Sequence, residues 1–470
     1  MVNLTFHGAA ETVTGSKYLL AADDAQVLVD CGLFQGLKEL RLKNWQPPQF
    51  DVGKLACVVL THAHIDHVGY LPRLVKLGFQ RDVWCTPATR QLADVILYDA
   101  AFNQEEEAEY ANRKKYSKHH PALPLYDDHD VERALKLLRP VERGQWFNPA
   151  GLIWCRYHDA GHLLGSAMIE VEVRQGSQPL RILFSGDVGR YDAPLYHDPA
   201  PPPECDYLIC ESTYGNREHE PERVLDQLAA VVQAAVARGG VMVMASFAVG
   251  RAQQLMYLLT VLAAQGRIPP LPIYLDSPMA VDATRIYSEH AGDLDLSESC
   301  LEGRPLPLDF HRVHLARTVA ESKAINDVRG PAVIISSSGM MVGGRILHHL
   351  RQRLPHAENT IVLGGFMAAG TRGRQLQEGA KSLRIHGASV PVRAAMAEVS
   401  ALSGHAGHSE LLRWLAPLSP PRQIFLTHGE LESARALAAE LHAKRGWNTC
   451  VPRMYETVAL APYTQAELKA

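Results

Sequence analysis

The sequence predicts an α/β protein with more than one domain. Short apolar runs rich in β-branched residues alternate along the chain with longer amphipathic stretches, a pattern typical of strands that alternate with helices. The chain has 470 residues, and because a domain usually takes roughly 100–200 residues, two or three domains are expected. Hydrophobic residues make up 47% of the chain and charged residues 21%, which is ordinary for a folded domain in water.

The individual elements follow from the period of the apolar residues. Apolar, β-branched runs predict strands at 26–30, 57–62, 181–187, 206–211, 241–247, 332–339, 359–366 and 423–428. Helical spacing predicts helices at 67–77, 131–138, 250–265, 343–354 and 431–444. The segment PAPPPE at 199–204 is predicted to be a rigid spacer.

Polar side chains stand where several of the predicted strands end. These residues are Asp30, His62, Asp187, Glu211 and His428. Ligand sites of α/β sheets lie at the carboxyl ends of the strands, so we expect one site assembled from residues distant in sequence. A single such residue would more often be a helix cap or a loop residue, but five together favour a site.

The segment HAHIDH contains the strongest metal-ligand pattern. Its His62, His64, Asp66 and His67 are ligands suited to zinc. In an extended segment His62 and His64 point the same way, while Asp66 and His67 lie at the turn into a predicted helix. One ion cannot comfortably take all four ligands from so short a segment, so two adjacent ions are expected.

Two other residues are weaker candidates when each is taken alone. His162 lies in a glycine-flanked turn before an apolar run, and Asp187 lies in the segment FSGDVGR. A carboxylate that bridges two zinc ions would hold them about 3.5–4 Å apart.

Charge and cysteine content restrict the class of protein. The net charge of −4 argues against polyanion binding by the whole surface, but residues 331–397 contain eight basic side chains against two acidic ones. That stretch is either a solvated helix face or a phosphate-binding surface. The eight cysteines form no CxxC pair, which disfavours a disulfide framework and a cysteine zinc site. Since neither a membrane span nor a secretory leader is recognisable, a cytoplasmic location is expected.

Several motifs of the chain occur together in one known family. HAHIDH, GHLLGS, SGD and Asp30 are similar to the four motifs of the metallo-β-lactamase superfamily, and ESTYG, LSGHAGHS and LTHGE resemble motifs A, B and C of its β-CASP branch. ASFAVGRAQQL, DSPMA, SSSGMMVGGR and GTRGRQL resemble further segments of that branch. The resemblance implies an αββα metallo-β-lactamase sandwich from residues 1–213 and 392–470, with an inserted α/β β-CASP domain at 214–391.

The resemblance also implies a role for each site residue. One zinc ion is expected on His62, His64 and His162, the second on Asp66, His67 and His428, with Asp187 bridging them. Asp30 is expected to orient a metal ligand, and Glu211 with His405 to form the acid pair at the leaving group. Motif B departs from the family pattern, because Gly407 stands where an Asp is common, and His408, Ser409 or Glu410 would have to substitute.

These features predict a zinc-dependent ribonuclease, acting as an endonuclease, a 5′-exonuclease or both, that uses metal-activated water and leaves 5′-phosphate and 3′-OH ends. A β-CASP lid, the basic stretch and a histidine in motif C favour RNA over DNA. The expected partner is single-stranded RNA, no membrane association is expected, and a homodimer is a further candidate assembly. The alternatives are a hydrolase of DNA or another phosphodiester, and a non-catalytic RNA-binding subunit. The residues expected to bind RNA are Ser338, Arg345, Arg372 and Arg374.

The expected role of Arg372 and Arg374 depends on the local structure of their segment. Arg372 and Arg374 would project the same way if the segment GTRGRQL is extended, and their guanidinium groups would then bind phosphates bidentately. The alternative is that both arginines form salt bridges inside the β-CASP domain.

Overall fold

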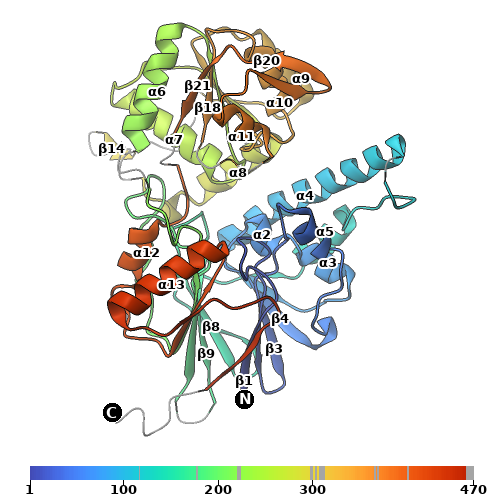
Figure 1. Ribbon diagram of the computed structural model, residues 1–470, viewed down its shortest axis with the longest axis vertical. Helices are drawn as coiled ribbons and strands as arrows, with labels where there is room; N and C mark the ends of the chain where they lie inside the picture. Colours follow the sequence, from blue (N-terminus) through green and yellow to red (C-terminus); the bar gives the residue numbers. More distant parts are fainter. Residues whose placement is uncertain are drawn as a thin grey trace. The chain divides into compact units, whose positions relative to one another are not determined.

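The chain folds into two compact units. The computed structural model describes residues 1–115, 117–175, 178–219, 224–296, 300–301, 304–305, 313–364, 367, 370–399 and 402–461. Unit 1 consists of Met1–Asp192, Asp198–Glu218 and His405–Ala470, and unit 2 of Ala193–His197 and His219–Gly404 (Figure 1). Among the described residues, no helix is both long and apolar enough to cross a membrane.

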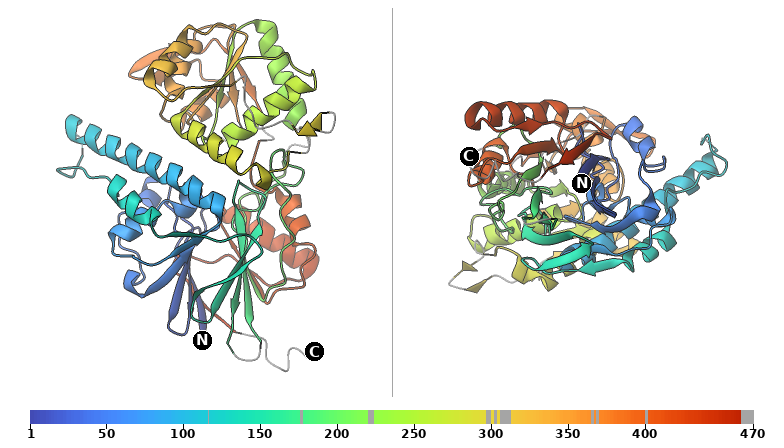
Figure 2. Two further views of the ribbon diagram at one scale, coloured as in Figure 1. Left: turned by 180° about the vertical axis from the view of Figure 1, so that it is seen from behind. Right: turned by 90° about the horizontal axis from the view of Figure 1, so that it is seen from below.

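Unit 1 is built on two seven-stranded sheets that face each other (Figures 1 and 2). The first sheet has the order β24 (Thr457–Leu460), β1 (Val2–Phe6), β2 (Tyr18–Ala22), β3 (Ala25–Val29), β4 (Leu55–Val59), β5 (Val83–Cys85) and β6 (Leu138–Pro140). The second has the order β23 (Thr449–Cys450), β22 (Gln423–Thr427), β11 (Tyr207–Glu211), β10 (Leu180–Phe184), β9 (Ala167–Val173), β8 (Ile153–Asp159) and β7 (Trp146–Ala150).

Helices cover the outer face of each sheet. They are α1 (Lys38–Lys43), α2 (Ile65–Val68), α3 (Leu71–Lys76), α4 (Pro87–Lys114) and α5 (Asp128–Leu135) with the first sheet, and α12 (His408–Leu415) and α13 (Leu431–Arg445) with the second. Strand β10 shows why the sheets are covered on both sides, because Ile182 and Phe184 enter the core between the sheets while Leu183 packs against the core under α12 and α13. The predicted αββα sandwich is therefore confirmed.

Unit 2 contains a six-stranded sheet in which every paired strand is parallel to its neighbour. Its order is β16 (Val313–Leu315), β13 (Ile273–Asp276), β17 (Ala332–Ser336), β12 (Val241–Ala245), β18 (Thr360–Leu363) and β21 (Ala395–Glu398). Its helices are α6 (Val224–Arg238), α7 (Arg251–Ala264), α8 (Pro278–Glu289), α9 (Val319–Ala324), α10 (Ile346–Arg353) and α11 (Arg372–Gln377), and two hairpins add β14 (Cys300–Leu301) with β15 (Arg304–Pro305) and β19 (Ser382–Ile385) with β20 (Ala388–Pro391). This is the inserted α/β domain that the sequence predicts.

The segment after residue 391 belongs to unit 2 as far as Gly404, because its strand β21 pairs with β18. The expected boundary at 391–392 lies just before that strand. The short segment Ala193–His197 also packs with unit 2, where the hydroxyl groups of Tyr196 and Tyr287 lie 2.9 Å apart.

The local expectations differ from the structure at several elements. The helix expected at 131–138 ends at Leu135, and Leu138 already belongs to β6. The helix expected at 67–77 is two helices, α2 and α3, because the chain turns at Gly69 and Tyr70. The longest helix, α4 with 28 residues, was not expected. Its polar outer half has little apolar periodicity, so the pattern of buried residues does not mark its length.

The strands that precede the candidate residues end at one edge of unit 1. Strands β3 and β4 are parallel, and so are β10, β11 and β22. Asp30 and His428 leave β3 and β22 with backbone φ angles of 58° and 47°. Residues other than glycine rarely adopt such angles, and they are found where function fixes the direction of a side chain.

Candidate metal centre

The seven predicted metal ligands all lie in unit 1, around the strand ends just described. The chain brings them together from four separate segments. They are His62 and His64 after β4, Asp66 and His67 in α2, His162 between β8 and β9, Asp187 after β10 and His428 after β22.

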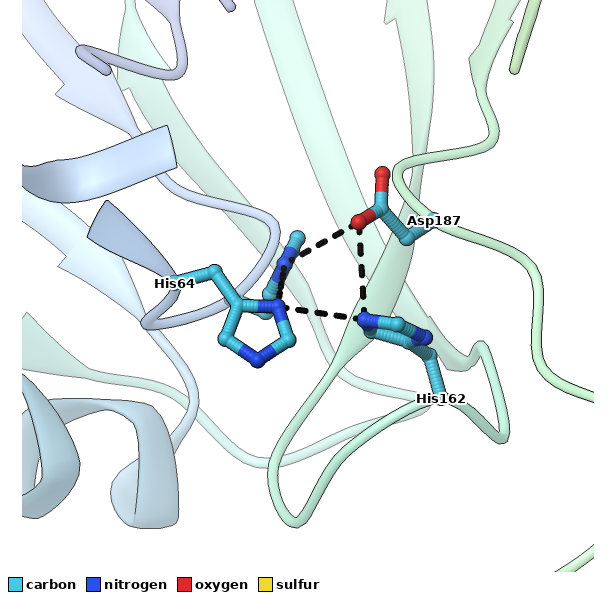
Figure 3. Close-up of side chains that lie close together, drawn as sticks. His64, His162 and Asp187 are labelled. Carbon is cyan, nitrogen blue, oxygen red and sulfur yellow. Dashed lines mark hydrogen bonds and ion pairs between the residues drawn. The ribbon is translucent and has the colours of Figure 1, made fainter. Parts of the chain in front are cut away.

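Four of these residues form a first cluster, whose ligand atoms all lie within 4.8 Å of one another. His64 Nδ1 is 3.0 Å from His62 Nε2 and 3.1 Å from His162 Nε2. Asp187 Oδ2 is 3.4 Å from both Nε2 atoms, and Figure 3 shows His64, His162 and Asp187 pointing at a common centre. Tetrahedral zinc with Zn–N distances of about 2.0–2.1 Å places its ligands about 3.3 Å apart, so these separations fit an ion of that size.

A second cluster lies on the other side of Asp187. His67 Nε2 is 3.1 Å from His428 Nε2, which in turn is 3.5 Å from Asp66 Oδ2. Asp187 Oδ1 is 3.3 Å from His67 Nε2, whereas its Oδ2 faces the first cluster. One carboxylate therefore presents one oxygen to each cluster, which is the arrangement of a bridging ligand in a two-metal site.

The donor set calls for cations. Asp187 Oδ1 is buried and, among the residues that the structure describes, has no hydrogen-bond partner. A buried carboxylate oxygen without a donor is costly unless positive charge compensates it. Burial alone would raise the pKa of Asp187 and of Asp66, but the surrounding imidazoles outweigh it and lower both pKa values, so both groups are ionised. These residues fit two divalent ions.

The histidines of the first cluster are neutral, as metal ligands must be. Burial, with the charge of His67, lowers the pKa of His62 to about 3, and burial lowers that of His64 to about 4. Burial and nearby His405 lower the pKa of His162 well below its ordinary value. Burial would also lower the pKa of His67, but Asp187 and Asp30 outweigh it and raise it.

Asp30 and Thr61 orient two of the imidazoles. Asp30 Oδ2 is 2.8 Å from His67 Nδ1, and it also accepts the Thr61 hydroxyl hydrogen at 2.9 Å. With its only hydrogen donated to Asp30, the Thr61 oxygen accepts from His62 Nδ1 at 3.0 Å. Both rings then direct the lone pair of Nε2 at the clusters, and such outer partners fix tautomer and orientation.

Thr213 holds His428 in the same way, and sequence reasoning missed both threonines. The Thr213 hydroxyl donates to the backbone carbonyl of His428 at 2.9 Å and accepts from its Nδ1 at 3.1 Å. The sequence indicated these roles only by position. Thr61 directly precedes the first histidine of HAHIDH, and Thr213 lies inside the motif ESTYG.

His405 and Glu211 form a pair beside the clusters. Both carboxylate oxygens of Glu211 lie 3.2 Å from His405 Nδ1, and Glu211 also accepts from the backbone amides of Val188 and Thr213. Burial lowers the pKa of His405, but Glu211 and Asp187 outweigh it and raise this pKa to about 10. His405 Nε2 lies 3.8 Å from Asp187 Oδ2, so a protonated imidazole faces the metal clusters.

Comparison with known proteins decides the family. Residues 12–207 match the family model of the metallo-β-lactamase superfamily, residues 252–376 that of the β-CASP domain, and residues 389–452 that of the Zn-dependent metallo-hydrolase RNA specificity domain. The ribonuclease TTHA0252 of Thermus thermophilus is 38% identical over 455 residues, which cover 96% of this chain and 98% of that relative. The chain belongs to the β-CASP branch of the metallo-β-lactamase superfamily. It is a metal-dependent hydrolase of that family.

Other relatives agree with this assignment. The transcription termination factor FttA of Methanosarcina mazei is 31% identical over 98% of this chain and 72% of its own length, and FttA of Pyrococcus horikoshii is 30% identical over 98% and 71%. A crystal structure of a protein of unknown function from Enterococcus faecalis has a TM-score of 0.56 at 14% identity, covering 98% of this chain and 100% of that one, and shares the fold.

The altered β-CASP motif B is supported by Glu410. Its carboxylate accepts from the amides of Gly407 at 2.8 Å and Tyr191 at 3.2 Å, and lies 3.3 Å from Arg190 Nε. These bonds tie the loop of His405 to the loop that follows Asp187. His408 and Ser409, the other two candidates, contact Gly215 and Glu218 instead. Of the three candidates, Glu410 is therefore the one whose carboxylate contacts the backbone of Gly407 itself.

The residues predicted to bind RNA lie in unit 2, where much of their polar capacity is used within the fold. Arg345 donates to Asp276 Oδ1 at 2.8 Å and to two backbone carbonyls, and the Ser338 hydroxyl accepts from the amide of Val342 at 3.1 Å. Arg374 pairs with Glu378 at 2.8 Å.

Arg372 donates to three backbone carbonyls, at distances of 3.0–3.3 Å. The segment of Arg372 and Arg374 is not extended, because the two residues lie in the helix α11. Residues two apart in a helix do not point the same way.

Proposed function

We propose that this chain is a zinc-dependent ribonuclease that hydrolyses RNA phosphodiester bonds and leaves 5′-phosphate and 3′-OH ends. The observation that carries the proposal is the position of Asp187 between two ligand clusters, with the His405–Glu211 pair 3.8 Å away. A site with two metal-ligand clusters and a separate proton donor suits the displacement of an oxygen from phosphorus.

We assign the seven candidate ligands to two zinc ions. His62, His64 and His162 would hold one ion and Asp66, His67 and His428 the other, with Asp187 shared. Bound zinc would supply the positive charge that polarises a phosphodiester and lowers the pKa of water to about 7. Zinc is supported by the histidine-rich donor set and by the match of residues 389–452 to a Zn-dependent metallo-hydrolase domain.

His405 would act as the general acid for the leaving oxygen. Its raised pKa keeps Nε2 protonated at neutral pH, and Glu211 holds the ring by Nδ1. A carboxylate behind the imidazole also stabilises the positive charge before the proton leaves. Asp30, Thr61 and Thr213 would act through the ligands that they orient, not on the substrate.

RNA is supported as the substrate by the relatives. This chain spans 98% of the ribonuclease TTHA0252 but 71–72% of the FttA proteins described above. The identity of 38% to TTHA0252 against 31% to FttA of Methanosarcina mazei makes the ribonuclease the better template for the activity. Transcription termination is the second candidate, favoured by the 31% identity to FttA, and it is compatible with RNA cleavage by the same site.

Sequencing of the cleavage products of a synthetic single-stranded RNA tests the proposal. Substrates with 5′-OH, 5′-monophosphate and 5′-triphosphate ends separate endonucleolytic from 5′-exonucleolytic cleavage. We expect 3′-OH and 5′-phosphate ends, because the ribose 2′-OH is not the nucleophile. A 2′,3′-cyclic phosphate, or cleavage of a matched DNA but not of RNA, would contradict the proposal.

Two variants test the assignment of roles. His405→Ala should lower kcat by about 10²–10⁴-fold, the usual contribution of general acid–base catalysis, with zinc content near wild type. His64→Ala should lose zinc as well as activity. Metal analysis of both purified variants is the measurement, and the roles are reversed if His405→Ala loses zinc while His64→Ala keeps it.

A further inference from the structure

The long helix α4 carries a cationic end that the proposed catalytic site does not use. It has 28 residues and therefore spans about 42 Å at 1.5 Å per residue. Its first turn lies beside the metal centre, because the hydroxyl groups of Thr86 and Thr89 both donate to the carbonyl of Gly165, close to His162. The other end of α4 extends away from the sheets of unit 1 (Figures 1 and 2).

The outer half of α4 is ordered but largely exposed. Between residues 102 and 114 the buried helix residues are Ala108 and Ala111. The chain then returns along the helix, and the side-chain amide of Asn112 exchanges two hydrogen bonds with the backbone of Ala122, at 2.9 and 2.7 Å. We call residues 112–115 and 117–120 the arm tip.

The arm tip concentrates positive charge. It contains Arg113, Lys114, Lys115 and Lys118, and there is no acidic residue from 110 to 126. Among the residues that the structure describes, none of these four cations forms an ion pair with a carboxylate. Glu109 is one helical turn before Arg113 and suitably spaced for a pair, yet the Arg113 guanidinium lies over the Tyr110 ring, 5.5 Å from its centre.

We propose that the arm tip binds the phosphate backbone of a single-stranded RNA whose cleaved bond lies at the metal centre. This inference rests on the proposed ribonuclease function. Lysine and arginine side chains that no carboxylate neutralises supply most of the affinity for nucleic acid. Tyr110, 48% exposed and flanked by Arg113 and Lys114, adds the aromatic face that single-stranded nucleic acid uses for stacking.

The charges along α4 limit this contact to its end. Glu105, Glu106, Glu107 and Glu109 occupy the shaft before the tip and would repel phosphates there. Glu109 is the acidic residue nearest the tip and lies five helical residues before Lys114, about 7.5 Å along the axis. This separation is close to the Debye length of about 8 Å at physiological salt, so salt already screens much of the effect of Glu109 at Lys114. The alternative partner of the arm tip is the acidic stretch of α4 in a second copy of the chain. The experiment below distinguishes such a dimer from RNA binding.

The test uses RNA length. At 3.4 Å per stacked nucleotide, about 12 nucleotides bridge 42 Å, so an RNA of about 30 nucleotides reaches the tip and one of about 4 does not. The variant is Lys114→Gln/Lys115→Gln/Lys118→Gln in the zinc-loaded enzyme. The same three positions changed to Arg keep the charge, and Lys38→Gln/Lys54→Gln/Lys323→Gln removes equal charge from exposed positions elsewhere.

For the long RNA, we expect the triple Gln variant to show a shallower dependence of log kcat/KM on log salt. Each lost phosphate contact on a single strand lowers this slope by about 0.7, so three lower it by about 2. The short RNA should be cut at the wild-type rate by every variant, and the Arg variant should match wild type on both substrates.

Three results would overturn the inference. These are an unchanged slope on the long RNA, an equal loss on both RNA lengths, and a wild-type dimer in sedimentation that the Gln variant breaks without any change in RNA cleavage. Failure of the proposed function is distinct, because the wild-type protein would then cut neither RNA.

Discussion

The pairing of Glu211 with His405 allows one quantitative prediction. Glu211→Gln removes a negative charge and keeps one acceptor oxygen, which can accept from the amide of Val188 or from that of Thr213, since these two amides donate to different oxygens of Glu211. At the observed 3.2 Å, the Coulomb energy of a charge pair is about 5 kcal/mol at an effective dielectric constant of 20. An opposite charge nearby usually shifts a pKa by about 1–3 units. In Glu211→Gln we therefore expect the pKa of His405 to fall by about 1–3 units from its wild-type value of about 10.

In the metal-free protein, the change in the pKa of His405 should be visible as a change in how stability depends on pH. The pKa of His405 in the folded protein is raised above its ordinary value of 6.5 to about 10. The protonated ring therefore stabilises the fold fully below about pH 6.5, and this stabilisation is lost as the pH rises towards 10. The measurement is the Tm of chelator-treated protein across that range, which should fall more for wild type than for Glu211→Gln.

In the zinc-loaded enzyme the same substitution should move the alkaline limb of kcat to lower pH, because His405 loses its proton sooner. Glu132→Gln, which removes an exposed carboxylate of α5, is the matched control and should leave both profiles in place. If Glu211→Gln changes neither the pH dependence of Tm nor the alkaline limb, Glu211 does not hold the proton on His405 and the acid assignment is refuted.

Three further predictions concern residues that hold the site or the fold. Thr213→Val should weaken zinc binding by about 10–100-fold, the usual cost of losing an outer partner of a ligand, while Thr213→Ser keeps it; equal zinc affinities in competition with a colorimetric chelator would remove Thr213 from that role. Arg372→Ala should lower Tm, since hydrogen bonds from charged groups contribute about 1.5–3 kcal/mol, and leave the salt dependence of RNA binding unchanged; the opposite pair of results would return Arg372 to the RNA-binding residues. Removal of zinc by a chelator should lower Tm at neutral pH, because Asp66 and Asp187 lose their counter-charge, and a Tm that does not respond would mean that no ion binds the folded chain.

The clustering of the candidate metal-binding residues was predictable because these residues lie in short segments with fixed local geometry. The strand-end pattern predicted that Asp30, His62, Asp187, Glu211 and His428 would meet, and the structure brings them together in unit 1. The carboxyl ends of parallel strands lie at one edge of a sheet. A polar residue directly after an apolar run is therefore predicted to lie near the other polar residues at that edge.

Other features depend on packing that the sequence pattern does not encode. The hydroxyl groups of Thr61 and Thr213 matter only because each lies about 3 Å from a particular imidazole nitrogen, and any threonine near a strand end looks the same in sequence. The basic stretch at 331–397 suggested phosphate contacts, yet Arg345, Arg372 and Arg374 donate to carbonyl or carboxylate oxygens within unit 2. Charge counts along a chain do not distinguish arginines that hold a fold from those that face a ligand.

A zinc titration of metal-free protein, followed by cleavage of one defined single-stranded RNA, tests the central claim most directly. The two clusters joined by Asp187 predict that activity appears only with metal and reaches its maximum at two zinc ions per chain. Full cleavage at one equivalent, or cleavage by protein that metal analysis shows to be zinc-free, would contradict the two-ion account.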